Sequence, residues 1–599
     1  MSASRLPGRL VIAASTSAPA ARSRSADAWL LALDDGSLRA PDGERHEVFS
    51  SARMAAVRAA AQAHAERALA ALEGGAPPRD ERRLALTIAA VTKIDVYLDA
   101  VAFMRSLAIV GRALEVASPR RGLWYADDAP LAHAVVGALG ARGSVRIVPS
   151  PPRRRGVSEA LLAAVKRRGM DWSLRSLASL ADGRPPPHAD VGVDVVGVFD
   201  VRNDGMIANV GLVLRELARQ GASTLALSMD RRVGAAVRAM GTSDRFATLA
   251  GYGRWSDART AVARTRSVQR ELASFWRAEA GEPHDRAMAA YTLRRFHAGY
   301  VWQTLVDASA AQRLLDEARP RAIMIASDAH RYARLLVLQA RARGVPTFVL
   351  QHGAIGERDL YVPLVADHML AWGPWCRDWF VAQRTPAARV HAVGFVRAPE
   401  RRPLRGPIPE DASMLFAAQP IPDGVTRELL EAVRFALEHD ARLRLVVRPH
   451  PGESRRASLD ALVATWPDGV RGRVALSPPG RSLTEDLDAA DAVVVSQSTV
   501  GIDALTVGVP TLLLSHERIP EVIPFHAFGG VVGAADGPEL VAGLRSLRDP
   551  ERLAELARGA HAFLEAYVGA TGPASLSAAA ALVRGASEAT PAPSPVATP

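Results

Sequence analysis

The chain has 599 residues, 48% of them apolar, and a mean hydropathy close to zero. This balance is typical of a globular protein with about three to four domain-sized units. No run of about 18 apolar residues predicts a transmembrane helix, and the single cysteine, Cys376, excludes an internal disulfide. The net charge of +11 comes almost wholly from arginine, because Lys93 and Lys166 are the only lysines. Such a charge indicates nucleic-acid binding only weakly, and it equally suits phosphorylated donors and anionic membranes.

Residues 1–185 are predicted to be an α-rich region with some α/β character, whose role the sequence leaves open. Ala-rich helices are expected over 51–73 and 81–115, and residues 120–148 read as strand, loop, helix and strand. The acidic pair Asp127-Asp128 in that loop is better explained as a loop and helix-cap pair than as a metal site.

Residues 186–398 are predicted to form a Rossmann-like domain. A buried-type strand ends at Asp200, and a polar loop containing Asp204 leads into a helix and a second strand. Ligands bind beyond the carboxyl ends of strands in such sheets, although Asp and Asn are also common turn residues. Residues 230–300 are expected to be helical, and their aromatic side chains to pack between helices, with an acceptor groove as the alternative.

A second strand–helix–strand unit is predicted over residues 321–353. Its first strand ends at Ser327-Asp328 and its second at Gln351-His352-Gly353. His352 is therefore a candidate for a catalytic or phosphate-contacting role, against the alternative of a capping or core histidine. Residues 399–584 are predicted to form a further Rossmann-like domain, followed by a disordered Ala/Pro/Ser-rich tail over 585–599.

Two polar clusters mark the domain over residues 399–584. One strand ends in Arg448-Pro449-His450-Pro451, and another ends in Ser496-Gln497-Ser498-Thr499, where a helix begins. Backbone N–H groups and the helix dipole attract anions at a helix start, and arginine and histidine can carry positive charge. Each motif alone could be a turn or a helix cap, but together they predict a phosphate site. Asp503, one turn into the helix, could accept from sugar hydroxyls, and Gln419 ends another strand at the same edge.

This stretch resembles the C-terminal domain of GT-B glycosyltransferases of bacterial capsule and cell-wall polymer synthesis. The resemblance includes polysialyltransferase-like, capsule Kdo-transferase-like and CDP-glycerol glycerophosphotransferase-like enzymes. It covers roughly residues 190–570 and rests on the two clusters, the acidic helix position and a set of further motifs: Gly508-Val509-Pro510, Gln351-His352-Gly353, Tyr361-Val362-Pro363, 366–373 and 393–395. Glycerophosphotransferases usually carry Asp where this chain has Ser496, which favours a nucleotide-sugar donor.

The resemblance implies an α/β fold with two Rossmann-like domains facing a cleft and an additional, mostly helical N-terminal region. It implies metal-independent transfer of a sugar from a nucleotide-linked donor to a surface polysaccharide or glycolipid acceptor, with no cofactor. The donor-binding residues would be Arg448, His450, Ser496, Ser498, Thr499, Asp503 and Gln419. Arg448 and His450 would stabilise the charge of the leaving nucleotide, and the base would be His352, Asp204 or Asp328.

Three alternatives remain open at the level of sequence. The chain could be a glycerophosphotransferase-like polymerase, a UDP-sugar epimerase of the same fold, or a non-catalytic glycan- or nucleotide-binding component of an assembly complex. We expect a cytoplasmic protein without a specific nucleic-acid partner, and we leave peripheral contact with the inner membrane open.

Overall fold

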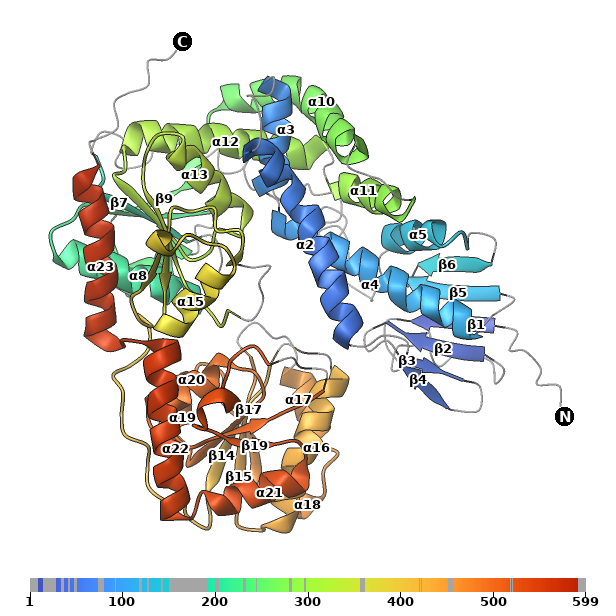
Figure 1. Cartoon of the computed structure of the whole chain (residues 1–599), viewed down its shortest axis with the longest axis vertical. Coiled ribbons are helices and arrows are strands. Elements are labelled where there is room, and N and C mark those ends of the chain that lie inside the picture. The colour runs from blue at the N-terminus through green and yellow to red at the C-terminus, as the bar shows by residue number, and fades with distance from the viewer. Residues whose placement is uncertain are drawn as a thin grey trace. The chain divides into compact units, whose positions relative to one another are not determined.

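The computed structural model shows a chain of α/β architecture (Figure 1). The residues that the structure describes are 9–13, 28–33, 37–40, 44–47, 51–73, 80–91, 93–117, 121–126, 129–141, 144–149, 192–199, 204–229, 233–243, 245–278, 283–295, 298–355, 361–419, 421, 423–450, 456–517, 519 and 521–590. Asp127-Asp128 lies outside them. Among the described helices, none has the length and apolar character needed to cross a membrane.

The chain divides into two compact units. The first unit comprises Met1–Ala189, Thr248–Glu317 and Ala329–Gln339, and the second comprises Asp190–Ala247, Ala318–Asp328 and Ala340–Pro599. The division therefore runs through residues 186–398, which the sequence predicts as one domain.

The first unit contains a six-stranded sheet of order β4-β3-β2-β1-β5-β6. Strands β1, β2, β5 and β6 pair in parallel, and β3 and β4 add an antiparallel edge. The strands are β1 (Arg9–Ala13), β2 (Ala28–Ala32), β3 (Ser37–Arg39), β4 (Arg45–Glu47), β5 (Arg121–Ala126) and β6 (Val145–Pro149). The predicted α-rich region thus carries a sheet of its own.

The helices of the first unit come from all three of its chain segments. Contacts join α2 to α4, α10 to α3 and α11 to α5. The helices are α2 (Ser51–Glu73), α3 (Asp80–Val91), α4 (Lys93–Ala117), α5 (Ala129–Ala138), η1 (Leu249–Tyr252), α10 (Trp255–Ala278), α11 (Pro283–Arg295), α12 (Ala298–Ala318) and α13 (Arg331–Arg341). The predicted packing of aromatic residues is confirmed for Trp276 and Tyr291, which are buried, but it is wrong for Trp255, which is exposed.

The second unit contains two Rossmann-like sheets, which confirms that part of the predicted fold class. The first sheet has the order β13-β12-β11-β10-β7-β8-β9. From β7 the chain proceeds through α8 to β8 on one side, whereas β10 pairs with β7 on the other side, so the strand order reverses between β7 and β10. Its strands are β7 (Val195–Phe199), β8 (Thr224–Ser228), β9 (Phe246–Thr248), β10 (Ala322–Ile325), β11 (Thr347–Leu350), β12 (His368–Ala371) and β13 (Val390–Ala392).

The second Rossmann-like sheet has the order β16-β15-β14-β17-β18-β19, and all its paired strands are parallel. Here the order reverses between β14 and β17, because β14 leads through α16 to β15 on one side and pairs with β17 on the other. Its strands are β14 (Ser413–Ala417), β15 (Arg444–Arg448), β16 (Val474–Leu476), β17 (Ala492–Val495), β18 (Thr511–Leu514) and β19 (Val532–Ala534).

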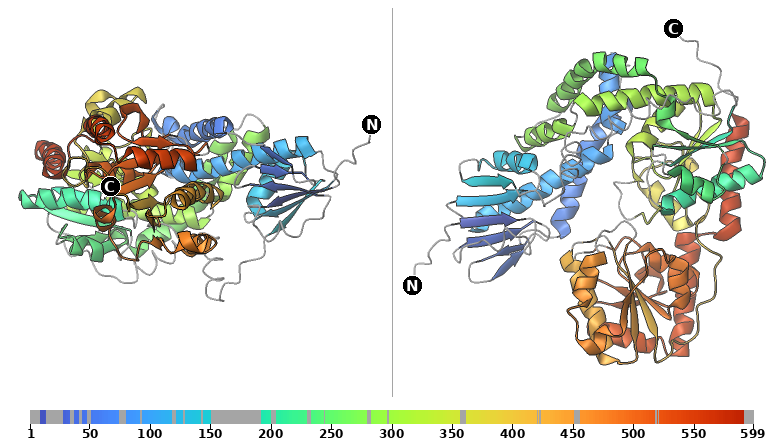
Figure 2. Two further views of the ribbon diagram at one scale, coloured as in Figure 1. Left: turned by 90° about the horizontal axis from the view of Figure 1, so that it is seen from below. Right: turned by 180° about the vertical axis from the view of Figure 1, so that it is seen from behind.

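Helices cover both faces of the second Rossmann-like sheet (Figure 2). Its core of Val, Leu, Ile and Phe side chains is closed by α16 and α21, which pack against each other. The helices are α16 (Asp423–His439), α17 (Arg456–Val463), α18 (Asp468–Arg471), α19 (Leu483–Ala489), α20 (Thr499–Thr506), η3 (His526–Phe528), α21 (Gly537–Ser546), α22 (Pro550–Phe563) and η4 (Leu564–Val568).

The last helix returns to the first Rossmann-like sheet. Helix α23 (Gly572–Ala589) packs on α8 (Asp204–Arg219), and Ala579, Ala580 and Val583 join the core of that sheet. This corrects the prediction of a disordered tail over 585–599, because residues 585–589 are the end of α23. The remaining helices of the second unit are α9 (Val233–Ala239), α15 (Pro374–Ala382) and η2 (Ala387–Arg389).

The motif ending in Trp372-Gly373 joins segments that are distant in sequence. Trp372 is buried and stacks on Phe395 with ring centroids 4.2 Å apart. The N–H of Gly373 donates to the carbonyl of Tyr567 at 3.0 Å, and a Cβ at Gly373 would lie 2.3 Å from the carbonyl oxygen of Ala566. Only glycine permits this close backbone approach.

Candidate functional site

The serine- and threonine-rich cluster lies where β17 ends and α20 begins, as predicted. The Oγ of Ser498 accepts a hydrogen bond from the N–H of Val500 at 3.2 Å and caps the helix. The Oε1 of Gln497 accepts from the N–H groups of Val522 and Ile523 at 3.0 and 2.9 Å. These two side chains therefore build the loop and the helix start. Thr499 is the partly exposed first residue of α20.

Two buried polar atoms at the reversal of strand order have no hydrogen-bond partner among the described residues. They are the Oγ of Ser496, a residue that is 3% exposed, and the Nε2 of Gln419. Ser496 directly follows β17 and Gln419 follows β14, and these two strands are neighbours in the sheet. Buried polar groups in proteins are almost always paired. A hydroxyl and an amide N–H are thus available to a ligand at the point where α/β sheets bind one.

Asp503 of α20 and Arg397 form a pair. The carboxylate of Asp503 is buried in α20, and the Nη2 of Arg397 lies 3.9 Å from its Oδ2. Burial raises the pKa of the Asp503 carboxyl above its ordinary value, and the charge of Arg397 opposes that rise. Arg397 also lies over the ring of Phe395, with its Cζ 4.9 Å from the centroid, and its Nε is buried and unpaired among described residues. Sequence reasoning missed Arg397, although it stands two residues after Phe395 of the recognised motif.

Arg448 is bonded within the protein at the end of β15. Its Nη1 donates to the carboxylate of Asp486 and lies 3.2 and 3.3 Å from the carbonyl oxygens of Arg481 and Ser482. The Nε of Arg481 lies 3.0 Å from the other oxygen of Asp486. Two arginines thus share one carboxylate. Arg456 adds a third guanidinium through its bond to the carbonyl of Ser477 at 2.7 Å.

His450 is half-buried and is the last described residue before 451–455, which lie outside the described part of the chain. It follows β15 by two positions, which places it at the same carboxyl edge as Ser496 and Gln419. Pro451 of the same motif lies outside the described residues.

The three candidate bases occupy different environments in the first Rossmann-like sheet. The Oδ2 of Asp328 accepts from the N–H groups of Val365 and Ala366 at 2.6 and 3.1 Å, so this buried carboxylate holds the segment that leads into β12. Asp204 is the first residue of α8, and its side chain lies outside the described part of the structure. His352 is half-buried beyond β11.

His352 has the geometry of an oriented imidazole. Its Nδ1 lies 3.0 Å from the carbonyl oxygen of Ala326, and its ring stacks on Tyr361 with centroids 5.3 Å apart. A carbonyl can only accept, so Nδ1 carries a proton at this contact. The preceding Gln351 is structural, because its Oε1 accepts from the N–H of Trp372 at 3.0 Å and its Nε2 donates to the carbonyl of Gly353 at 3.0 Å.

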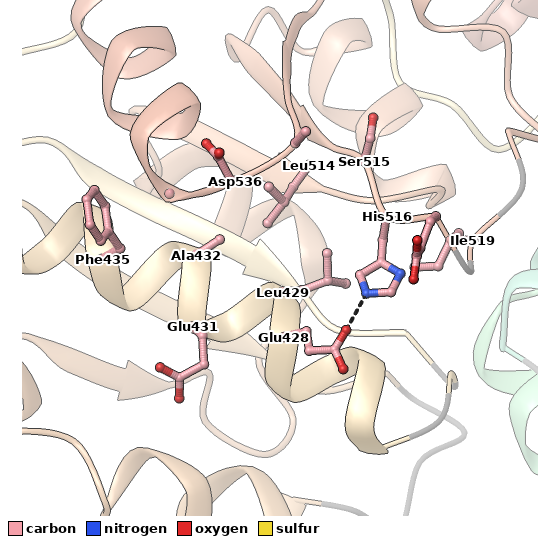
Figure 3. Close-up of a pocket in the computed structure, with 13 residues that line it drawn as sticks. Glu428, Leu429, Glu431, Ala432, Phe435, Leu514, Ser515, His516, Ile519 and Asp536 are labelled. Carbon is pink, nitrogen blue, oxygen red and sulfur yellow. Dashed lines mark hydrogen bonds and ion pairs between the residues drawn. The ribbon is translucent and has the colours of Figure 1, made fainter. Parts of the chain in front are cut away.

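A cavity of about 800 Å³ lies between α16, the loop after β18 and the start of α21 (Figure 3). Because Val495 pairs with Leu513, Ser496 stands next to Leu514, which lines the cavity. The Nε2 of His516 lies 2.7 Å from a carboxylate oxygen of Glu428. The carboxylates that line the cavity belong to Glu428, Glu431, Glu517 and Asp536. Sequence reasoning did not identify this cavity, although Ser515-His516-Glu517 follows a strand end in the same way as the recognised clusters.

In the part of the chain that the structure describes, no group of three or more histidine, cysteine or acidic side chains is arranged to hold a metal ion. The polar atoms at the carboxyl edge of the second Rossmann-like sheet are instead suited to an anionic, hydroxylated ligand. Guanidinium and N–H groups bind phosphates, and carboxylates accept from hydroxyls.

No family model matches the chain, and no curated protein matches it. Among solved structures, it is similar to UDP-GlcNAc 2-epimerase from Neisseria meningitidis bound to UDP-GlcNAc, with 13% identity over 65% of this chain and 100% of that one and a TM-score of 0.41. It is also similar to MurG of Acinetobacter baumannii, with 13% identity over 65% and 99% and a TM-score of 0.40. For CalG4, the calicheamicin glycosyltransferase, the identity is 15% over 66% and 98%, with a TM-score of 0.39. Likeness of this size does not extend to substrate or reaction.

Proposed function

We propose that the protein is a metal-independent glycosyltransferase of the GT-B type, which moves a sugar from a nucleotide-linked donor to a surface polysaccharide or glycolipid. The observation that carries the proposal is the pair of unpartnered buried atoms, Ser496 Oγ and Gln419 Nε2, at the reversal of strand order. The two clusters that resemble those of polymer-synthesising GT-B enzymes follow β15 and β17 of the same sheet.

The diphosphate of the donor would lie at the start of α20. The helix dipole contributes about 0.3–2 kcal/mol there, and each hydrogen bond to a charged group adds about 1.5–3 kcal/mol. Ser496, Gln419 and His450 together supply three such bonds. Micromolar affinity requires about 8 kcal/mol, so these contacts are sufficient in size. Arg448 and Arg481, which share the carboxylate of Asp486, lie at the same edge of the sheet.

The sugar hydroxyls would be recognised by carboxylates. Asp503 is buried beside Arg397, and burial of a carboxylate costs stability unless a ligand donates hydrogen bonds to it. The acidic cavity next to Ser496 offers further acceptors for a polyhydroxylated group.

The chemistry then needs a leaving nucleotide stabilised by positive charge and a base for the acceptor hydroxyl. The guanidinium groups at the carboxyl edge of β15 and His450 supply the first. We assign the second to His352, whose imidazole is held in one orientation by the bond from Nδ1–H to the carbonyl of Ala326. Arg448 acts mainly through its charge, since its Nη1 is bonded to Asp486.

The first test measures binding of CMP, CDP, UDP, GDP and ADP by calorimetry to the wild type and to Ser496→Ala. We expect one of the nucleoside diphosphates to bind. The variant should bind it about tenfold more weakly, because the hydrogen bond from the Ser496 hydroxyl, worth about 1.4 kcal/mol, is lost. Ser575→Ala is a matched control, because the Oγ of Ser575 is also buried and unpartnered among described residues but lies in α23. Equal affinities in all three proteins would refute the donor site.

The reaction is tested by product analysis with the nucleotide that binds. A nucleotide-sugar carrying that base is incubated alone and with a glycan or lipid-linked acceptor. Nucleotide release that depends on the acceptor supports a transferase, whereas formation of an epimer from donor alone would replace the proposal with an epimerase. Binding without any turnover would favour a non-catalytic component.

A further inference from the structure

Helix α10 carries an exposed basic stripe, which we define by eight residues on one face of the helix. At 100° per residue these positions fall within an arc of about 100°. The residues of the stripe are Trp255, Arg259, Val262, Arg266, Gln269, Arg270, Ala273 and Arg277. The stripe runs over about 33 Å of helix, at 1.5 Å per residue. A hollow of about 530 Å³ follows its second half, lined by Arg266, Gln269, Arg270, Ala273 and Arg277.

The rest of α10 fixes the stripe toward the outside of its unit. The opposite face is buried through Ala261, Thr265, Val268 and Leu272, and the helix packs on α3. Asp257, which lies off the stripe, is bonded to Arg313 of α12, and the Nε1 of Trp302 donates to the carbonyl of Ala258 at 2.9 Å. The stripe itself contains no acidic residue.

The arginines of the stripe are not neutralised by the described protein. Within the ranges that the structure describes, Arg259, Arg266, Arg270 and Arg277 form no ion pair, and all four are exposed. Two large apolar side chains lie among them, because Trp255 is 52% exposed and Val262 is 66% exposed. Four like charges along one helix face repel one another, so this arrangement is stabilised by an anionic surface.

We propose that the basic stripe of α10 docks the protein on a membrane rich in anionic phospholipid. Charge complementarity accounts for the arginines, and the apolar residues favour a lipid surface over a charged polymer. Tryptophan is enriched at the membrane interface, and a cluster of four or more arginines on one helix is attracted to anionic lipid headgroups. This inference does not depend on the proposed function, and it uses no residue of the donor site.

The test is co-sedimentation of the full chain with vesicles of phosphatidylcholine alone or mixed with phosphatidylglycerol. We expect binding only to the mixed vesicles, and its loss at high salt, which screens exposed charges. Each arginine near an anionic surface strengthens binding about fivefold. The variant with Arg259, Arg266, Arg270 and Arg277 changed to Gln should therefore bind several hundredfold more weakly. Its unfolding temperature should stay unchanged, because the four side chains are exposed.

A matched control removes the same charge elsewhere. Changing four exposed arginines of the second unit to Gln lowers the net charge equally and should leave vesicle binding within about twofold, because long-range charge alone is screened beyond about 10 Å. The four residues are Arg238, Arg377, Arg545 and Arg558. Equal losses in both variants would show that only the net charge matters and would overturn the proposal, as would absence of binding to the mixed vesicles.

The fluorescence of Trp255 distinguishes binding to a membrane from binding to a soluble polyanion. Brominated lipid in the mixed vesicles should quench part of the tryptophan fluorescence of the wild type, and this part should be missing in Trp255→Phe. Binding to RNA or to an acidic polysaccharide with the same loss on α10 substitution, but without quenching by brominated lipid, would overturn the membrane in favour of that polymer.

Discussion

The two Rossmann-like sheets of the second unit share a topology but differ in how their strand ends are satisfied. In the first sheet, Asp328 and Gln351 follow β10 and β11, and both bond to the protein's own backbone. In the second sheet, Gln419 and Ser496 follow β14 and β17, and each leaves a buried atom without a described partner. Strand-end position alone therefore does not identify a ligand site.

The difference shows what an internally bonded polar residue does for the fold. Asp328 gives two backbone N–H groups of residues 365–366 a partner that the sheet cannot provide. Ser496 and Gln419 gain nothing comparable, and a buried polar atom without a partner costs about 1–3 kcal/mol. Such a loss of stability is reasonable at a binding site, because a bound ligand can form the missing hydrogen bond. His352 is intermediate, because one ring nitrogen is bonded and its orientation is thereby fixed.

The largest expected effect concerns His352. If it is the base, His352→Ala should lower kcat by about 10²–10⁴-fold with little change in nucleotide affinity, because the donor contacts lie on the other sheet. His391→Ala, which alters another half-buried histidine of the same sheet, should keep kcat near the wild-type value. Steady-state kinetics with calorimetry would check both. Full turnover in His352→Ala would return the role of base to Asp204 or to a residue outside the prediction.

Asp328 is predicted to affect stability more than catalysis. Asp328→Ala leaves two buried N–H groups without their acceptor and should lower the free energy of unfolding by about 3 kcal/mol, measured by urea titration. Asp328→Asn keeps a carbonyl oxygen at the same place and should lose less, while retaining turnover. Loss of turnover in a stable Asp328→Asn protein would show instead that the carboxylate takes part in the reaction.

In contrast to Asp328, Gln419 is predicted to affect ligand binding more than stability. Gln419→Met removes an amide whose Nε2 is buried and unpaired among described residues, so the ligand-free protein should be as stable as the wild type or slightly more stable. Nucleotide binding should weaken about five- to tenfold through the lost hydrogen bond. Thermal unfolding with and without nucleotide separates the two effects. A less stable ligand-free variant with unchanged affinity would assign Gln419 to the fold and remove the contrast between the sheets.

The smallest effect is a pH dependence from Asp503. Burial raises the pKa of its carboxyl in the folded protein, so the folded state binds more protons than the unfolded chain between the ordinary and the raised pKa. Stability from this group is therefore present below the ordinary pKa and falls as pH rises through that window. Asp503→Asn should be more stable than the wild type at pH 7 and not at pH 3, as urea titrations at both pH values would reveal. A less stable variant at pH 7 would mean that the pair with Arg397 outweighs burial.

The sequence predicted most of the second unit because its signals are local. Apolar strands such as Ala492–Val495 and helix starts such as Ser498 follow from residue type and period, and both occur where expected. The tail prediction was wrong at 585–589 because an Ala/Ser-rich composition resembles disorder, although Val583 and its neighbours pack on α8. The sheet of the first unit was underestimated, since its strands β2 to β4 are short.

The sequence by itself determined the fold class, the positions of the polar strand ends and the arginine-rich character of α10, because these depend on short-range pattern. Only the tertiary structure decided which polar atoms are satisfied. Arg448 meets Asp486, which lies 38 residues away, and Asp328 meets Val365, whereas Ser496 and Gln419 meet no partner among the described residues. It also placed Arg397 beside Asp503. Hydrogen-bond partners at a sheet edge depend on which distant segments the fold brings together. They therefore cannot be predicted from the residues that flank a position in the sequence.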